Sequence, residues 1–237
     1  MSSYRRILLK LSGEALSGKR GYGFDRTAIE TISRQVKEVH DLGIETAVVI
    51  GGGNIFRGLE ASAEGMNRVT ADQMGMLGTM INGLALQDSL EKTGVSVRIL
   101  SSRSVDELVE PFNRRQTLGY LEQGHIVIFV GGTGNPFFST DTAASLRAAQ
   151  IGADVILTGT KVDGVYDGDP VKDPAAKKFD TITFDEVLNL GLKVMDSTAI
   201  AMCRDNNIPI VVFNLTKEGT LLRVVNGEPL GTIVKDK

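Results

Sequence analysis

Residues 131–141 combine residue types and spacing that suit anion binding. The segment consists of Gly131, Gly132, Thr133, Gly134, Asn135, Pro136, Phe137, Phe138, Ser139, Thr140 and Asp141. An apolar run typical of a buried strand precedes it, and an alanine-rich run typical of a helix follows it. Glycines let the backbone approach a ligand, and free amides at a helix N-terminus attract negative charge. Ser139 or Thr140 can cap that helix, which places Asp141 in its first turn. A turn without a ligand is the alternative interpretation of this segment alone.

Three more glycine-bearing turns follow apolar runs, and two of them carry a cation. Lys10 ends the run 7–11 beside Ser12 and Gly13, which makes it a candidate phosphate ligand. The run 46–50 leads into three successive glycines, and Arg57 lies close behind with a guanidinium that can hold a phosphate through two hydrogen bonds. The third turn follows Leu157 and contains Gly159.

One stretch imitates a Walker A loop but lacks its chemistry. Gly13 to Lys19 has the spacing G-x-x-x-x-G-K. The next residue is Arg20, whereas a Walker A loop needs a Ser or Thr hydroxyl for magnesium, and a second glycine turn follows instead of a helix. The residues Gly18, Lys19, Arg20, Gly21, Tyr22 and Gly23 therefore predict an exposed loop.

The charged residues at these turns suit phosphoryl transfer. Lys10 and Arg57 supply positive charge, while Asp72 and Asp141 supply carboxylates. That reaction depends on positioning and on neutralising charge at the transferring oxygens more than on a covalent nucleophile. A hydrolase built on a transition metal is disfavoured, because two scattered histidines and one cysteine make a poor ligand set. The aspartates of residues 163–176 lack the alternation of a calcium loop.

Strands and helices that alternate along the chain must position these turns. Predicted strands cover residues 7–11, 46–50, 95–100, 126–130, 154–157 and 209–213, with an edge strand at 232–234. Predicted helices cover residues 25–42, 70–93, 114–122, 142–151, 183–191 and 196–203, with a short one near 221. The order predicts an α/β fold: a three-layer sandwich with an open, mainly parallel sheet covered by helices on both faces. Ligands bind such sheets beyond the carboxyl ends of the strands, so the four turns are expected to meet at one edge.

Helix-capping patterns refine these expectations. Thr70 and Thr183 each begin a capping-box pattern, so each is expected to start a helix. Asp25 and Asp196 are expected to cap two others. The helix from Thr70 is apolar on more than one face, which indicates burial or a subunit interface. Asp72 then becomes a first-turn carboxylate, which favours the helix dipole or accepts hydrogen bonds from ligand hydroxyls.

Length and composition favour one domain over residues 1–237. A net charge of −3 and a pI near 5.5, without a long basic run, argue against a nucleic-acid partner. The single cysteine, Cys203, excludes an internal disulfide and is expected to be buried. The first strand is too short for a signal segment or a membrane span, so a cytoplasmic protein without membrane contact is expected.

Six motifs together resemble the bacterial uridylate kinases, a branch of the amino-acid-kinase superfamily. They are Lys10-Leu11-Ser12-Gly13, Gly51-Gly52-Gly53-Asn54, Phe56-Arg57-Gly58, Gly65-Met66-Asn67-Arg68, residues 133–141 and residues 160–166. The first and last are shared with relatives that phosphorylate carboxylates or carbamate. The Gly-Thr-Gly-Asn-Pro-Phe-Phe segment is specific to the uridylate branch.

The resemblance implies an amino-acid-kinase-like fold and transfer of a phosphoryl group from ATP, with Mg²⁺, to UMP. The residues implied to bind ATP are Lys10, Leu11, Ser12, Gly13, Gly53, Arg57, Thr160, Tyr166 and Asp169. Those implied to bind UMP are Gly52, Asp72, Thr133, Gly134, Asn135, Pro136, Phe137, Phe138, Ser139 and Thr140. Lys10, Asp141, Arg57 and Lys161 are the implied catalytic residues, and no protein ligand of the metal is implied. A homohexamer is also implied, with GTP as activator, acting through residues 18–23, and UTP as inhibitor. A kinase for a small carboxylate or carbamate, or a silent nucleotide sensor of the same fold, are the alternatives.

Overall fold

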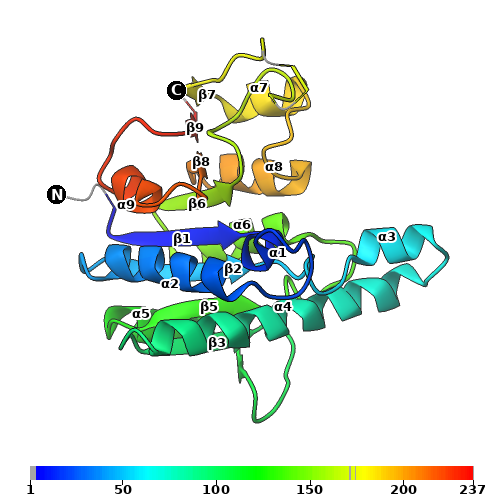
Figure 1. Cartoon of the computed structure of the whole chain (residues 1–237), viewed down its shortest axis with the longest axis vertical. Helices are drawn as coiled ribbons and strands as arrows, with labels where there is room; N and C mark the ends of the chain where they lie inside the picture. Colours follow the sequence, from blue (N-terminus) through cyan, green and yellow to red (C-terminus); the bar gives the residue numbers. More distant parts are fainter. Residues whose placement is uncertain (1–3, 171, 174, 237) are drawn as a thin grey trace.

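The computed structural model describes residues 4–170, 172–173 and 175–236. Within them, nine strands form one sheet in the order β4-β3-β5-β2-β1-β6-β8-β9-β7 (Figure 1). Neighbouring strands run parallel except β8 and β9, which run antiparallel. The strands are β1 Arg6–Leu11, β2 Glu45–Ile50, β3 Val97–Ser101, β4 Glu110–Pro111, β5 Ile126–Val130, β6 Val155–Thr160, β7 Thr181–Ile182, β8 Ile210–Asn214 and β9 Thr232–Val234.

Helices cover both faces of this sheet, as the alternation of elements predicted. One apolar cluster joins the sheet to α1, α2, α4 and α9, and a second joins the opposite face to α5, α6, α7 and α8. Strands covered on both faces read as continuous apolar runs, and β5 and β8 are buried along their whole length. The helices are α1 Gly13–Ser17, α2 Arg26–His40, α3 Gly58–Ala63, α4 Arg68–Glu91, α5 Arg114–Glu122, α6 Thr140–Ile151, α7 Phe184–Asn189, α8 Ser197–Asp205 and α9 Thr220–Val225.

Most helix starts follow the capping residues expected from sequence. Asp25 accepts a hydrogen bond from the Ala28 amide at the start of α2 (3.1 Å). The capping box at Thr183 is present with both of its bonds. Ser139 caps α6, so Asp141 lies in the first turn of that helix. These starts were predictable because each capping residue acts on amides two or three positions away.

The start of α4 differs from the prediction. Its N-cap is Asn67, whose Oδ1 accepts from the amides of Val69 and Thr70 (3.0 and 3.2 Å). Thr70 therefore lies inside the helix, and Asp72 belongs to its second turn instead of its first. Asn is as good an N-cap as Thr, and here it acts first along the chain. Figure 1 shows α3 and the first turns of α4 extending beyond the ends of the central strands.

Two details of the sheet also correct the prediction. Residues 232–234 are not an edge strand, because β7 pairs with β9 on its outer side. Gly159 is not in a turn: it lies inside β6 and pairs with Leu11 and Phe213. The short helices α1 and α3 were not predicted, because helices of five or six residues carry too little periodicity to be recognised.

The long helix α4 is apolar on two faces, as predicted. Its inner face is buried against the sheet and includes Met76, Met80, Leu86 and Leu90. Its outer face exposes a second apolar row, formed by Val69, Met74, Leu77, Ile81 and Leu84. Among the described residues, no helix combines the length and apolar character needed to cross a bilayer.

Candidate functional site

The four central strands bring the predicted turns to one edge of the sheet. β5, β2, β1 and β6 are consecutive neighbours and run parallel, so their carboxyl ends share one side. Leu11 at the end of β1 pairs with Ile50 at the end of β2. The expected meeting of the turns is therefore confirmed, with the β6 connection starting at Lys161 instead of Gly159.

A partly buried ion pair lies at the centre of this edge. Lys10 is the penultimate residue of β1, and its Nζ lies 2.6 Å from Oδ1 of Asp141 in the first turn of α6. The two side chains are 14% and 22% exposed. Charges attract more strongly where water is partly excluded, and the α6 N-terminus also favours the carboxylate. Strand and helix thus hold a cation and an anion in a fixed arrangement.

Asp196 ties the α6 N-terminus to that of α8. Its carboxylate accepts hydrogen bonds from the hydroxyls of Ser139 and Thr142, with Thr142 Oγ1 at 3.0 Å from Oδ2. It also caps α8 by accepting from the Ala199 amide (2.8 Å). Sequence analysis identified only the cap. The second contact joins residues 54 positions apart, which no local pattern reveals.

A second, more exposed set of charges surrounds Glu14 of α1. Arg57 Nη2 lies 2.6 Å from Glu14 Oε1, and Lys161 Nζ lies 3.4 Å from Glu14 Oε2. Arg57 also pairs with Glu60 (3.1 Å). The charge of Glu14, followed by the hydrogen bond to Glu60, raises the pKa of the Arg57 guanidinium. Glu14 was missed by sequence analysis, although it directly follows the Lys10 to Gly13 motif.

A cavity of about 570 Å³ collects eight of the predicted site residues. It lies between the segment that follows β2, the start of α4 and the loop before α6. The predicted residues that line it are Gly52, Gly53, Arg57, Asp72, Phe137, Phe138, Ser139 and Thr140. Thr133, Gly134, Asn135 and Pro136 are not among its lining residues. In that part of the loop, Thr133 Oγ1 accepts from the Asn135 amide (3.1 Å).

Asp72 joins α4 to the loop across this cavity. Its carboxylate accepts from Nε of Arg68 (2.8 and 2.9 Å) and from the Phe137 amide (2.7 Å). The Arg68 guanidinium also lies over the Phe137 ring, 5.2 Å from its centroid. Phe137 has a φ of 72°, which is unfavourable for a bulky residue. The contacts with Asp72 and Arg68 hold the loop in this conformation.

Buried α4 backbone and side-chain groups position the glycines. A Cβ at Gly52 would lie 2.6 Å from the Gly75 carbonyl oxygen. Only glycine therefore allows the segment that follows β2 to approach α4 this closely. Thr79 Oγ1 accepts from the Gly131 amide (2.7 Å) and donates to the Met76 carbonyl (2.6 Å). Sequence analysis missed Thr79, because it lies mid-helix among apolar residues.

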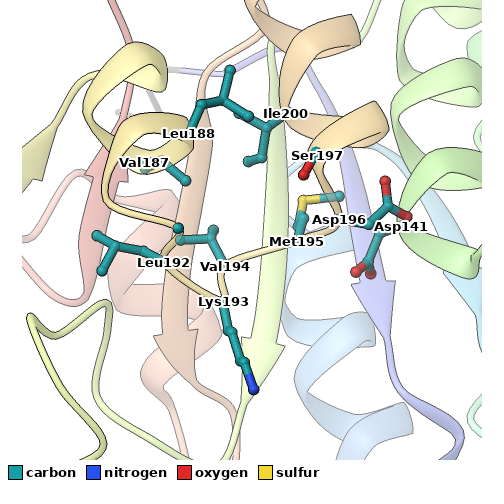
Figure 2. Close-up of a pocket in the computed structure, with 11 residues that line it drawn as sticks. Asp141, Val187, Leu188, Leu192, Lys193, Val194, Met195, Asp196, Ser197 and Ile200 are labelled. Carbon is teal, nitrogen blue, oxygen red and sulfur yellow. The ribbon is translucent and has the colours of Figure 1, made fainter.

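A second cavity, of about 420 Å³, lies on the other side of the α6 N-terminus. Figure 2 shows Asp141 and Asp196 together on one side of it, with Val187, Leu188 and Leu192 on the opposite side. The Lys193 side chain extends from the segment between α7 and α8, downward in the view of Figure 2 and away from the apolar side chains. Asp196 lines both cavities. Asp141 of the Lys10–Asp141 pair thus lines the second cavity, and Asp196 connects that cavity to the first.

Comparison with known proteins identifies the family. The model of the amino acid kinase family matches residues 5–214. The chain belongs to the amino acid kinase family.

Two solved structures of the family are similar over nearly their whole length. One is named as UMP kinase from Bacillus anthracis: it is 41% identical, with a TM-score of 0.95, and the match covers 99% of this chain and 97% of that one. The other is named as UMP kinase from Ureaplasma parvum: it is 39% identical, with a TM-score of 0.92, and the match covers 98% and 99%.

Other residues implied by the family resemblance lie apart from both cavities. Thr160 Oγ1 donates to the carbonyls of Val162 and Phe213 (2.7 and 3.2 Å). Tyr166 forms an isolated bridge with Lys178. Thr160, Tyr166 and Asp169 are not among the lining residues of either cavity. Residues 18–23 form a connection after α1 whose middle residues, 19–22, are exposed, as predicted, and Tyr22 is 78% exposed.

Few side chains at this site could bind a metal ion. In the described part of the chain, no three His, Cys, Asp or Glu side chains come together as a metal site would require. Asp141 and Asp196 do line one cavity. One or two carboxylates suit Mg²⁺ that arrives with nucleotide phosphates and keeps several waters, so these residues fit such an ion.

Proposed function

We propose that this chain transfers the γ-phosphoryl group of ATP to UMP, giving UDP and ADP. The Lys10–Asp141 pair carries the proposal, because it fixes a cation near the end of β1, and Asp141 itself lines a cavity of about 420 Å³ that is large enough for a ligand. Two proteins named UMP kinase are 41% and 39% identical to this chain over nearly its full length. This similarity supports UMP as the acceptor.

The acceptor nucleotide is proposed to bind in the 570 Å³ cavity. Gly52 and residues 137–140, which line this cavity, would surround UMP, and residues 133–136 of the same loop would close over it. Asp72 would accept hydrogen bonds from the ribose hydroxyls. Asp72 is suited to this role because Arg68 and the Phe137 amide already hold its carboxylate against the cavity. Arg57 and Gly53 would contact phosphate, since both line the same space and Gly53 leaves room for a close backbone approach.

The donor is proposed to present its phosphates to Lys10, Leu11, Ser12 and Gly13, with Thr160, Tyr166 and Asp169 holding the adenosine. In the transfer, an oxygen of the UMP phosphate attacks the γ-phosphorus. The bond from that phosphorus to the β-γ bridging oxygen breaks, and ADP leaves with the electron pair. Lys10 offsets the charge that develops on the transferring oxygens, and Asp141 holds Lys10 in place. Lys161 lies close enough to the same edge to assist.

Mg²⁺ is proposed to accompany ATP. Asp141 and Asp196 are the side chains that would hold it, directly or through water, because their carboxylates line the cavity beside Lys10. When bound, the ion would neutralise phosphate charge. Lys10 and Arg57 would still orient the phosphates.

Self-association is proposed through the exposed apolar row of α4. This row, Val69, Met74, Leu77, Ile81 and Leu84, is the kind of surface that a partner covers. A homohexamer, activation by GTP through residues 18–23, inhibition by UTP, a role in pyrimidine nucleotide and CTP synthesis, and a cytoplasmic location complete the proposal. They follow from the family resemblance.

An assay of ADP release tests the activity and its alternatives together. The chain is incubated with ATP and Mg²⁺, and UMP, CMP, aspartate or carbamate is supplied in turn. Turnover with UMP alone is expected. Equal turnover with aspartate or carbamate would identify a carboxylate or carbamate kinase, and no turnover with any acceptor would identify a nucleotide sensor. The Lys10→Ala variant serves as the control for contaminating kinases.

A further inference from the structure

Two buried asparagines meet beneath the glycine turns. Asn54 directly follows the triple glycine after β2, and Asn82 lies in the middle of α4; they are 3% and 0% exposed. Asn82 Nδ2 donates to Asn54 Oδ1 (2.6 Å), and Asn54 Nδ2 donates to Asn82 Oδ1 (3.1 Å). The two carboxamides thus form a reciprocal pair in a place that water does not reach.

The remaining amide hydrogens of this pair hold two backbone segments. Asn82 Nδ2 also donates to the Gly51 carbonyl (2.6 Å). Asn54 Nδ2 also donates to the Gly23 carbonyl (2.8 Å), and the Gly23 amide donates back to the Asn54 carbonyl (2.8 Å). Each carboxamide has two N–H donors, so all four are used. A fully satisfied buried polar group specifies one arrangement of the segments that it joins.

The pair also sets the spacing of the turns after β1 and β2. A Cβ at Gly13 would lie 2.3 Å from Asn54 Oδ1 and 2.8 Å from the Gly53 nitrogen. The Gly13 backbone therefore rests directly on Asn54. The Gly51 amide donates to the Leu11 carbonyl (2.9 Å), which joins the same turns on the strand side.

We propose that Asn54 and Asn82 are positioning residues for phosphate binding. Through Gly51 and Gly13 they fix the two glycine turns at the spacing that the phosphates of both nucleotides need. Through Gly23 they hold the exposed loop of residues 18–23 against the same turns. Both side chains are buried, so they act through the backbone and do not touch substrate. The catalytic part of this inference rests on the proposed kinase function, whereas the part concerning the loop does not.

Kinetics of Asn54→Ser and Asn82→Ser test the catalytic part. The matched control is Ser33→Ala, which removes a partly buried hydrogen bond between α2 and α4, the one between Ser33 Oγ and Ser89 Oγ (2.8 Å). Well below their unfolding temperatures, both Asn variants are expected to lose about tenfold to a hundredfold in kcat, because small displacements of reacting groups are costly. KM for both nucleotides is expected to rise as well. The control is expected to lose stability only. Wild-type kcat and KM in two folded Asn variants would overturn the assignment.

Limited trypsin digestion tests the loop part without requiring turnover. Lys19 and Arg20 are exposed cleavage sites within residues 18–23. Asn54→Ser is expected to be cut there about fivefold faster than wild type, the change that one lost hydrogen bond gives in a local opening equilibrium. Ser33→Ala is expected to be cut at the wild-type rate. Equal cleavage rates in all three proteins would overturn the proposal that Asn54 holds the loop of residues 18–23. If wild type showed no turnover with UMP, only the proposed function would fail, since cleavage is measured independently.

Discussion

The charged side chains at the ends of the central strands form two sets that differ in burial. Lys10 and Asp141 are 14% and 22% exposed and are held by a strand and a helix turn. Arg57, Glu14 and Lys161 are 45%, 41% and 63% exposed. Glu14 lies in the short helix α1, Arg57 precedes the short helix α3, and Lys161 lies in the connection that follows β6. Both sets contain cations that can reach phosphate at one edge of the sheet.

This difference separates two tasks. Exposed ion pairs contribute only about 0–1 kcal/mol, so Arg57 and Lys161 can leave Glu14 for a phosphate at little cost. Lys10 is already fixed, and a fixed charge does not have to reorganise when charge moves in the transition state. The partly buried pair, Lys10 and Asp141, is therefore expected to act mainly on kcat, and the exposed set, Arg57, Glu14 and Lys161, mainly on KM.

The largest expected effect comes from breaking the partly buried pair. Lys10→Ala and Asp141→Asn are each expected to lower kcat about 10²- to 10³-fold, because a preorganised charge is lost or released. Thermal unfolding should show that both variants fold. Arg26→Ala is the matched control, since it breaks the exposed Arg26–Glu30 pair of α2, which has no assigned role in binding or catalysis. A kcat near that of wild type in both variants would contradict the assigned roles.

A smaller effect, of a different kind, is expected from the exposed set. Arg57→Ala should raise the KM of at least one nucleotide about tenfold or more, the value of a hydrogen bond to a charged group, with a smaller change in kcat. Glu14→Gln should act in the opposite direction and lower that KM slightly, because Arg57 and Lys161 lose their competing anion. Steady-state kinetics with each nucleotide varied would measure both. A drop in kcat as large as that of Lys10→Ala would remove the distinction between the sets.

Asp72 extends the comparison to the acceptor cavity. Asp72→Asn should raise the KM for UMP about tenfold and leave the KM for ATP unchanged, because a charge-assisted acceptor becomes a neutral one. It should also loosen the Phe137 segment, whose amide donates a hydrogen bond to Asp72 (2.7 Å). Asp88→Asn, which alters an exposed pair on the same helix, is the control. Equal changes for UMP and ATP would place Asp72 outside the acceptor site.

Sequence patterns predicted the parts of this site that depend on neighbouring residues. The loop before α6, its Ser139 cap and the position of Asp141 all follow from residues within a few positions of one another. The start of α4 was wrong because Asn67 and Thr70 are both good caps three residues apart, and propensity does not choose between them. The expected position of Asp72 was wrong for the same reason.

Contacts between distant residues were beyond such patterns. Asn82 and Thr79 lie mid-helix in a sequence that reads as apolar, and only the packing of α4 on the β2 and β5 connections gives them partners. Glu14 and Asp196 likewise gain their roles from residues 43 to 147 positions away. The β7–β9 pairing depends on strands of two and three residues, which are too short to carry an alternation.

Cys203 shows how burial alone, without an opposite charge nearby, changes the pKa of a side chain. Its substitution is expected to have the smallest effect on activity. It is fully buried in α8, and burial raises the pKa of its thiol to about 11, opposed only partly by a hydrogen bond with Ser145 (3.2 Å). Iodoacetamide at pH 8 should therefore leave the folded protein unmodified and alkylate it in urea. Between pH 9 and 11 an unfolded thiol ionises while the folded one keeps its proton, so the stability of wild type relative to Cys203→Ala should fall as pH rises. Rapid alkylation of the native protein would show that α8 opens, and with it the Asp196 link to α6.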